Sequence, residues 1–311
     1  MLILLLALVA SVLIGSRLVP PTDLFRSGTM GHDILLARLP RTVLAALVGA
    51  ALGLAGGCLQ GLTRNPLADP GLLGIDAGAS FAMVLAINDL GVGDLHEYVW
   101  FAFAGAGVTA VVVHGLASLG RGGATPGKLV LVGAAVTAAL SSGTSGLLLV
   151  QHHTMDVFRS WQVGTVGGRG WPVILTGLPF LAAGTVLALA AARTLDALAL
   201  GDDLARGLGH RVASDRIVIG LAVVLLAGTS TALAGPIGFV GLIAPHLVRL
   251  AHGSAYIRVL PLAALYGAAL VLLADTVGRV VLPPTEVQVG IMTAVVGVPA
   301  FCWFLRRGRF A

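Results

Sequence analysis

Long uncharged apolar stretches recur along the chain from one end to the other. Leu129–Val150 and Ile217–Ala234, for example, contain no charged residue, and each is long enough to be a transmembrane helix, which needs about 20 apolar residues. Only 11% of the 311 residues are charged, whereas soluble domains carry roughly 25%. So few charges cannot cover a soluble body of this size. Lipid must therefore be the solvent for much of its surface.

These stretches predict helices rather than strands. A backbone in lipid must satisfy its own hydrogen bonds, which only helices and closed barrels achieve. Barrel strands would read as alternating segments of about 10 residues, whereas this chain has unbroken apolar runs. We therefore predict an all-α polytopic membrane protein in which residues 1–311 form a single transmembrane domain of about ten helices. The predicted spans are 1–18, 42–62, 72–90, 98–119, 129–150, 172–192, 217–234, 236–250, 259–278 and 290–305.

The eighth predicted span differs from the others. It is short and contains Gly238, Gly241 and Pro245, so we expect it to be broken or re-entrant. It also carries His246, and an ionisable group inside a span is a functional candidate by default, as a ligand or proton carrier. Its position near the end of the segment, beside Arg249, favours a structural hydrogen bond instead.

The basic residues predict the orientation. With the N-terminus inside, twelve of the 19 Lys and Arg residues fall on the cytoplasmic side and seven on the outer side. Cytoplasmic loops of membrane proteins are enriched in Lys and Arg, so we expect both termini to be cytoplasmic in the plasma (inner) membrane. Met1–Ile14 has no basic leader and is expected to be a first span rather than a cleaved signal. The seven outer arginines still need an explanation.

No motif predicts an enzyme. Gly122–Leu129 nearly spells a phosphate-binding loop, but Leu129 stands where such a loop needs Ser or Thr, and an apolar helix precedes it instead of a strand. Cys58 and Cys302 lack metal-ligand or redox spacing. We expect no catalytic residue, no metal site, no cofactor and no nucleic-acid partner. The absence of a paired acid and base argues against an intramembrane enzyme.

Two motifs are predicted at the outer mouth of the bundle. Arg38-Leu39-Pro40-Arg41 precedes the second span, and Asp275 and Arg279 lie four residues apart on one face of the ninth. The arginines could anchor the helices at the interface by snorkelling. Alternatively, they could bind carboxylates of an acidic partner, because the arginine fork contacts a carboxylate in two places. Asp275 and Arg279 could also form a local ion pair.

Two motifs are predicted on the inner side. The stretch Gln60–Gly74 contains two prolines and several glycines, which predict a tight reversal whose apolar Leu67 could seal a pore. Leu195–Arg216 is the longest cytoplasmic loop and is expected to form one or two short surface helices with a turn at Gly207-Leu208-Gly209. On the outer side, Gln151–Trp171 is expected to contain a short helix.

Together these segments resemble the FecCD-type permease family, the membrane subunits of ABC importers for ferric siderophores, haem and cobalamin. The resemblance covers about residues 20–308. It rests on Arg38-Leu39-Pro40-Arg41, Asn65-Pro66-Leu67, the glycine-rich Gly235–Arg249 stretch and Ala274-Asp275, in the family's order and spacing. It implies the fold of a type II ABC importer permease with ten spans, which moves its cargo inward by alternating access.

The resemblance also implies partners and residue roles. The partners are two cytoplasmic ABC ATPases, a substrate-binding protein on the outer face and a second permease subunit, identical or homologous, all assembled in the lipid bilayer. The residues implied to dock the binding protein are Arg38, Arg41 and Arg279. The residues implied to form the cytoplasmic gate are Asn65, Pro66, Leu67, Pro126 and Gly127, although some relatives have small hydroxyl residues where this chain has the last two. The residues implied to couple to the ATPase are Leu200, Gly201, Asp202, Ala205, Arg206, Leu208 and Gly209.

The cargo is less strongly indicated. Trp161-Gln162-Val163-Gly164 and Arg169-Gly170-Trp171 are more similar to siderophore permeases than to cobalamin permeases, which favours a ferric siderophore over haem or cobalamin. A rival class is the ion-coupled secondary transporter, which would favour buried mid-membrane carboxylates and inverted repeats. Asp275 is the one plausible deep acid in the sequence, and no repeat is evident.

Overall fold

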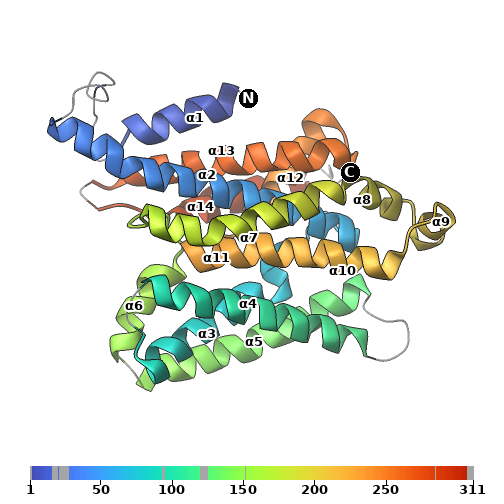
Figure 1. The fold of residues 1–311 in the computed structure, drawn as a ribbon. Helices are drawn as coiled ribbons and strands as arrows, with labels where there is room; N and C mark the ends of the chain where they lie inside the picture. The colour runs from blue at the N-terminus through green and yellow to red at the C-terminus, as the bar shows by residue number, and fades with distance from the viewer. Residues whose placement is uncertain are drawn as a thin grey trace.

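The computed structural model describes residues 2–15, 20, 28–92, 95–119, 125–150, 152–283 and 285–306, and these contain helices and no strand. The helices run roughly side by side along one direction (Figure 1). They are α1 (Leu2–Leu13), α2 (Met30–Thr63), the short η2 (Pro70–Leu73), α3 (Ile75–Leu90), α4 (Leu95–Ser118), α5 (Pro126–Val150), α6 (His152–Gln162), α7 (Trp171–Ala190), α8 (Ala192–Ala199), α9 (Asp202–Gly207), α10 (Val212–Val223), η3 (Val224–Gly228), α11 (Thr229–Ala234), α12 (Val240–His252), α13 (Tyr256–Val281) and α14 (Val289–Arg306).

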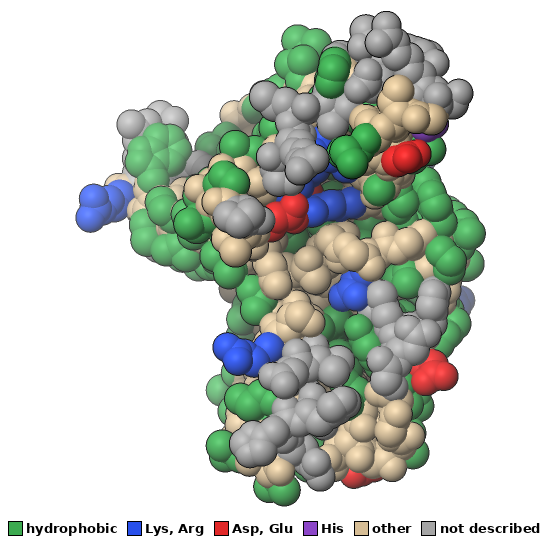
Figure 2. Space-filling model, turned by 90° about the vertical axis from the view of Figure 1, so that its left-hand side faces the viewer, with side chains coloured by type: hydrophobic (Ala, Val, Ile, Leu, Met, Phe, Trp, Pro, Cys, Tyr) green, Lys and Arg blue, Asp and Glu red, His purple; other side chains and the backbone are tan. Residues whose placement is uncertain are grey.

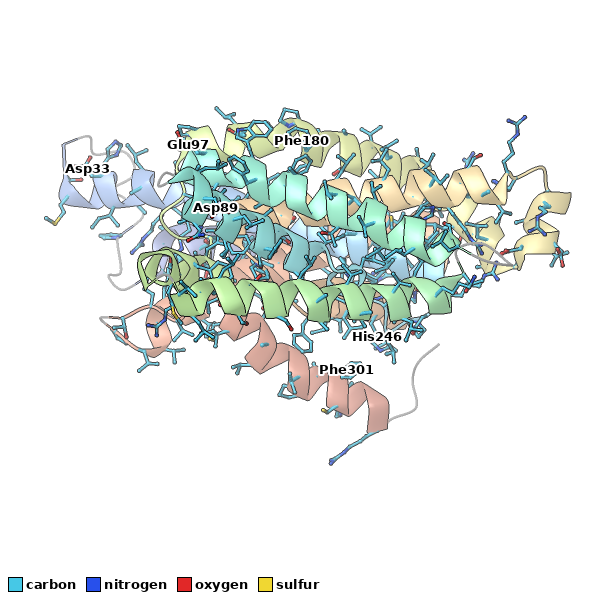
Figure 3. The ribbon with its side chains drawn as sticks, turned by 90° about the horizontal axis from the view of Figure 1, so that it is seen from below. Asp33, Asp89, Glu97, Phe180, His246 and Phe301 are labelled. Atoms are coloured by element: carbon cyan, nitrogen blue, oxygen red, sulfur yellow. The ribbon has the colours of Figure 1, made fainter. Side chains whose placement is uncertain are left out.

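Each predicted span overlaps a helix of the structure, so the prediction of an all-α polytopic protein is confirmed. Within the described ranges, six helical segments are long and apolar enough to cross a membrane, and α1 and α14 are shorter apolar helices. The segment Val212–Ala234 counts as one of the six because the π-helical turn η3 joins α10 directly to α11. The tenth predicted span, α14, diverges from the rest of the bundle toward its C-terminal end, where Phe301 lies (Figure 3).

The bundle has two distinct ends. One end, called the α6 end, holds α6, the start of α2 and the connection between α13 and α14 (Figure 1). The opposite end, called the α8–α9 end, holds those two short helices. The predicted short helices in the loops 151–171 and 195–216 are therefore confirmed as α6 and as α8 with α9.

Helix α2 is the axis of the fold, and small residues let its neighbours touch its backbone. A methyl group added at Gly49 would collide with the carbonyl oxygen of Gly267 in α13, and one added at Gly56 would collide with the carbonyl oxygen of Gly241 in α12. Membrane helices that pack this closely depend on such small residues. The high glycine content thus serves helix packing around α2.

The eighth predicted span is interrupted only at its start, because α12 continues without a break through Gly241 and Pro245. Residues 235–239 separate α11 from α12, and Phe239 adopts a left-handed conformation with φ of 67°. The loop after α6 covers this break, because the backbone N–H of Thr165 donates to the carbonyl of Ala234 at 2.6 Å. His246 is buried in α12, with 4% of its surface exposed.

Two helix starts that differ from the predicted spans change where the predicted site residues lie. Helix α2 begins at Met30, so Arg38-Leu39-Pro40-Arg41 lies inside the helix rather than at its mouth. Helix α5 begins at Pro126, so Pro126 and Gly127 form its first turn rather than a loop. Proline suits that position because its missing N–H has no helical partner there. The glycines of the sequence that resembled a phosphate-binding loop, 122–123, lie outside the described residues.

Candidate functional site

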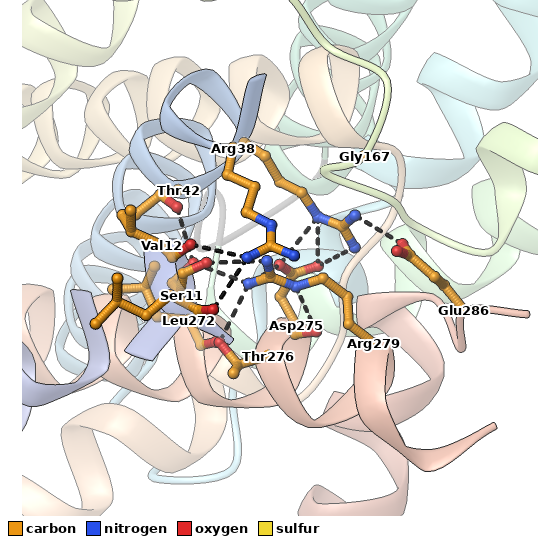
Figure 4. A network of polar contacts seen from close by, with 12 residues as sticks. Ser11, Val12, Arg38, Thr42, Gly167, Leu272, Asp275, Thr276, Arg279 and Glu286 are labelled. Atoms are coloured by element: carbon orange, nitrogen blue, oxygen red, sulfur yellow. Dashed lines mark hydrogen bonds and ion pairs between the residues drawn. The ribbon is translucent and has the colours of Figure 1, made fainter. Parts of the chain in front are cut away.

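Arginines and carboxylates from distant parts of the chain meet at the α6 end. Arg41 binds Asp275 through two nitrogens, with Nη2 2.8 Å from Oδ1 and Nε 3.1 Å from Oδ2, and its Nη1 donates to Glu286 at 2.7 Å. Asp275 also pairs with Arg279 at 3.1 Å, so the predicted local ion pair is confirmed. Figure 4 shows Asp275 next to Arg279. Asp275 and Arg279 are only 1% and 2% exposed.

The same cluster ties α1 to the bundle. Arg279 donates to the carbonyl of Ser11 at 2.9 Å and to its hydroxyl at 3.0 Å. Arg38 donates to the carbonyls of Val12 and Leu13 at 3.0 and 3.1 Å (Figure 4). These are the carbonyls at the C-terminal end of α1, where a cation is favourable. We call Ser11, Arg38, Arg41, Asp275, Arg279 and Glu286 the arginine network.

A cavity of about 560 Å³ opens beside the arginine network. Its lining includes Arg38, Arg41, Arg169, Arg279 and Glu286. Figure 2 views the molecule from this end and shows basic and acidic side chains side by side in a hollow of the surface. Most of this cavity's charge is therefore positive, which suits a carboxylate.

The structure brings together the three arginines that the sequence singled out for docking, and their role remains a prediction. Of their contacts, only the pair between Arg279 and Asp275 was foreseen. Arg279 is buried, with 2% of its side chain exposed, whereas Arg41 is 17% and its partner Glu286 39% exposed. Glu286 was missed because it lies in no motif, and Arg169 was noted only as part of the Arg169-Gly170-Trp171 segment, without a role at this site. Their nearness to proline and glycine in connecting segments was the only signal.

At the α8–α9 end, the turn between α2 and α3 is tightly built. Arg64 ends α2 in the left-handed conformation, with φ of 49°, and its backbone N–H bonds to the last carbonyls of the helix. The side chain of Asn65 accepts a hydrogen bond from the N–H of Leu67 at 2.9 Å, which holds the reversal. Leu67 itself is 37% exposed. Asn65, Pro66 and Leu67 therefore form the turn that the sequence predicted, and their gating role remains a prediction.

Asp69 follows in the same turn. Its carboxylate accepts a hydrogen bond from the N–H of Gly71 at 3.0 Å and so caps η2. Burial raises the pKa of this carboxyl group to about 6, an effect that the Gly71 hydrogen bond opposes and the nearby charge of Asp76 adds to.

The loop predicted to couple to an ATPase contacts this turn directly. Asp202, the first residue of α9, binds Arg64 of the turn and Arg216 of α10, the latter at 3.0 Å. Arg64 also donates from Nε to the carbonyl of Leu198 in α8 at 2.9 Å. We call Arg64, Asp202 and Arg216 the Asp202 bridge. Sequence reasoning missed Arg64 and Arg216 because 138 residues separate Arg64 from Asp202.

The other predicted coupling residues surround the bridge. Leu200 and Leu208 are 61% and 64% exposed, as is Leu204 at 61%, so three leucines form an apolar surface at this end. Gly201 and Gly209 adopt positive φ values of 115° and 89°, which explains why glycine stands at both turns. Within α9, Ala205 is buried, and Arg206 pairs with Asp203 at 2.7 Å.

A bundle of apolar membrane-length helices with charged clusters at its two ends is the architecture of a multi-pass membrane transport protein. The chain belongs to the FecCD transport family, whose model matches residues 3–307.

Relatives with related functions agree with this assignment. The probable siderophore transport system permease protein YfiZ of Bacillus subtilis is 43% identical, over 91% of this chain and 85% of its own length. The ferric enterobactin transport system permease protein FepD of Escherichia coli is 41% identical, over 99% of this chain and 93% of its own length. The structure of a metal-chelate type ABC transporter in an inward-facing conformation matches with a TM-score of 0.86 and 28% identity, covering 98% of this chain and 96% of that chain.

Proposed function

We propose that the chain is the permease subunit of an ABC importer that moves a ferric siderophore from an external binding protein into the cytoplasm. The observation that carries this proposal is the similarity over nearly the whole chain to permeases of siderophore import. Haem and cobalamin remain the alternative cargoes. In this proposal the chain itself is not an enzyme, and ATP hydrolysis belongs to two partner subunits.

The surface supports a second permease subunit as one partner. Among the described side chains of α5, only Gly133 and Thr144 are buried in the single chain, and the hydroxyl-bearing Ser141, Ser142 and Ser145 are exposed. Small and hydroxyl side chains are typical of helix–helix contacts in membranes rather than of lipid-facing surfaces. The diverging helix α14 likewise exposes the apolar side chains of Val295, Val296 and Trp303. A second permease would cover these faces and complete the pathway between the subunits.

In the proposed orientation, the α8–α9 end lies on the cytoplasmic side of the plasma (inner) membrane, and both termini lie on that side. The topology predicted from the sequence assigns twelve of the 19 Lys and Arg residues to this side, in keeping with the bias of membrane proteins. The exposed leucines at 200, 204 and 208 then face the ATPases, and an exposed apolar patch is typical of an interaction surface.

The arginine network then faces the binding protein. Arg38, Arg41 and Arg279 dock the acidic residues of that partner, and Arg169 lines the same cavity. Nη1 of Arg41 already holds Glu286 at 2.7 Å, in a pair that is partly exposed to solvent. A carboxylate of the binding protein therefore replaces Glu286 as a partner of Arg41. The buried Asp275 keeps Arg41 in place during this exchange.

The Asp202 bridge is the proposed route from the ATPase to the gate. A non-glycine residue in the left-handed conformation costs roughly 1–3 kcal/mol and persists where other contacts hold it. Arg64 adopts it, and its side chain binds both α8 and α9. A movement of α9 therefore pulls directly on the turn that carries Asn65, Pro66 and Leu67. Pro126 and Gly127, at the start of α5, complete the proposed gate.

The ion-coupled alternative finds less support. Asp275, the deep acid on which the sequence-based case for it depended, is paired with both Arg41 and Arg279 and is only 1% exposed. The deciding experiment is uptake by proteoliposomes. Ferric siderophore uptake should require the ATPases, ATP and the binding protein. Uptake driven by a proton or sodium gradient without the ATPases would overturn the proposal, and uptake of haem or cobalamin in place of the siderophore would correct the cargo.

A further inference from the structure

A large groove runs between α4 and α10 at the α8–α9 end of the bundle. Its volume is about 1240 Å³, and its walls are mostly apolar. Phe103 and Val111 of α4 line one wall, and Leu221 of α10 with Val224 of η3 lines the other. Ferric chelates are polar, so walls of this kind do not suit the proposed cargo.

Glycines widen this groove. Gly107 and Gly115 on α4 and Gly220 on α10 all line it, and a methyl group added at any of them would meet no atom within 4 Å. These glycines differ from those of α2, where an added methyl group would collide with a neighbouring helix. The chain therefore leaves this space unfilled by its own packing.

The end of the groove is basic. Arg206, His210, Arg211 and Arg216 line it there, and no carboxylate lines the groove among the described residues. Three of these basic side chains already have acidic partners, Arg206 with Asp203, His210 with Asp215 and Arg216 with Asp202. The exposed side chain of Arg211 has no ion pair or hydrogen bond with any described residue.

We propose that this groove binds one anionic glycerophospholipid, with its phosphate at Arg211 and Arg206 and an acyl chain along the apolar walls. Basic pockets between membrane helices are typical sites for anionic headgroups. The groove is also long enough. From Phe103 to Ser118, α4 rises about 22 Å at roughly 1.5 Å per residue, which exceeds half of the hydrocarbon thickness of about 30 Å.

The charge at the rim selects this occupant over a second copy of the chain. The exposed hydroxyl-bearing face that suits a second permease lies on α5, whereas the α4–α10 groove combines apolar walls with the positive charge of Arg211, which no described acidic residue neutralises. An apolar tail next to a negative phosphate matches that combination. The site does not depend on the proposed transport function, because it requires only that the bundle lie in a membrane.

The test uses the purified full-length chain in a neutral detergent. Dioleoylphosphatidylglycerol, dioleoylphosphatidylcholine and inorganic phosphate are titrated separately, and the melting temperature and the lipid bound per chain by native mass spectrometry are measured. Phosphatidylglycerol should bind with one molecule per chain and raise the melting temperature by several degrees. The other two should do neither.

Variants separate the headgroup from the tail. The double variant R206Q/R211Q should weaken phosphatidylglycerol binding at least tenfold. The matched control R193Q/R258Q removes the same charge from exposed arginines at the same end but outside the groove, and should bind normally. The variant G107L/G220L keeps both arginines and fills the groove where an added Cβ has free space, so it should lose the lipid as well.

Five outcomes would overturn the proposal. Equal binding of the two lipids would make the groove an ordinary lipid-facing surface, and an equal effect of phosphate would make it a simple anion site. Normal binding by G107L/G220L would place the lipid elsewhere. A shift of that variant from dimer to monomer without lipid loss would identify a second copy as the occupant. If G107L/G220L fails to fold, equal binding by R206Q/R211Q and its control would still refute the site.

Discussion

The arginine network and the Asp202 bridge use the same chemistry at opposite ends of the bundle, but they differ in burial. Asp275 and Arg279 of the network are 1% and 2% exposed, whereas Arg64 and Asp202 of the bridge are 41% and 28% exposed. Breaking a buried ion pair strands a charge and is costly, while a half-exposed pair is screened by water and contributes little to stability. The comparison indicates that the network holds the fold together and that the bridge is free to exchange partners.

The largest effect is expected where the network is most buried. Asp275→Asn removes the carboxylate shared by Arg41 and Arg279 and leaves two neighbouring cations without it. We expect a loss of about 3–5 kcal/mol in the free energy of unfolding, measured by denaturant unfolding in detergent. Glu286→Gln is the matched control, because its pair with Arg41 is partly exposed, and should cost far less. Equal losses would contradict the ranking by burial.

The bridge should show the opposite pattern, with intact stability and lost function. Asp202→Asn breaks the contacts to Arg64 and Arg216, and we expect at least a tenfold fall in chelate transported per ATP hydrolysed, with little change in melting temperature. Asp203→Asn is the control, because it removes the same charge from the adjacent residue, which pairs only with Arg206 of its own helix. Coupling that is equally normal in both variants would remove the bridge from the proposed route.

The turn residue of the bridge offers a sharper version of this test. Arg64→Gly relieves the left-handed strain while removing both side-chain contacts. Glycine adopts this conformation at no steric cost, so the variant should melt at the same temperature as the original chain or slightly above it, yet couple as poorly as Asp202→Asn. A drop in melting temperature of more than a few degrees would show that the bridge is structural after all.

The exposed edge of the network should behave like the bridge. Suppose that a carboxylate of the binding protein replaces Glu286 as a partner of Arg41. Glu286→Gln removes this competitor, so it should raise the affinity of the binding protein for the permease about threefold. The effect is modest because a partly exposed ion pair contributes up to about 1 kcal/mol. Arg41→Glu should lower that affinity, and a reciprocal glutamate-to-arginine change on the binding protein should partly restore it. The measurement is the dissociation constant at low and moderate salt.

These two variants fail in distinguishable ways. Unchanged affinity in Arg41→Glu would refute docking at the network. Lower affinity in both Arg41→Glu and Glu286→Gln would keep docking but refute the exchange, because Glu286 would then be positioning Arg41 rather than competing for it.

The smallest effect is expected at Asp69, the acidic residue of the α2–α3 turn. Its pKa of about 6 in the folded chain lies above the ordinary value of 3.8, so the folded state binds more protons in this range. Its contribution to stability is therefore fully present below about pH 4 and is lost as the pH rises through about 6. Asp69→Asn should remove this dependence and melt slightly higher than the original chain at pH 8. A parallel pH profile for both chains would contradict the assignment.

Several features of the fold could be predicted from the sequence because they depend on local composition. Apolar runs of sufficient length predict the helices, and proline with glycine predicts the α2–α3 reversal and the break before α12. The predicted starts of the second and fifth spans, at residues 42 and 129, lie inside longer helices that begin at Met30 and Pro126. Hydropathy marks the part of a helix that lies in lipid, whereas the helix itself continues as long as its backbone hydrogen bonds are satisfied. Arg38 and Arg41 therefore lie within α2.

By itself, the sequence determined that this chain is a helical membrane protein and, through several spaced motifs, that it resembles the FecCD permeases. Only the tertiary structure decided which distant partner each charged group has. Arg279 meets Ser11 and Arg64 meets Asp202 across 268 and 138 residues of chain. A hydrogen bond forms only over about 3 Å, so such pairs depend on how whole helices pack, and residue types and spacing along the chain do not contain that information.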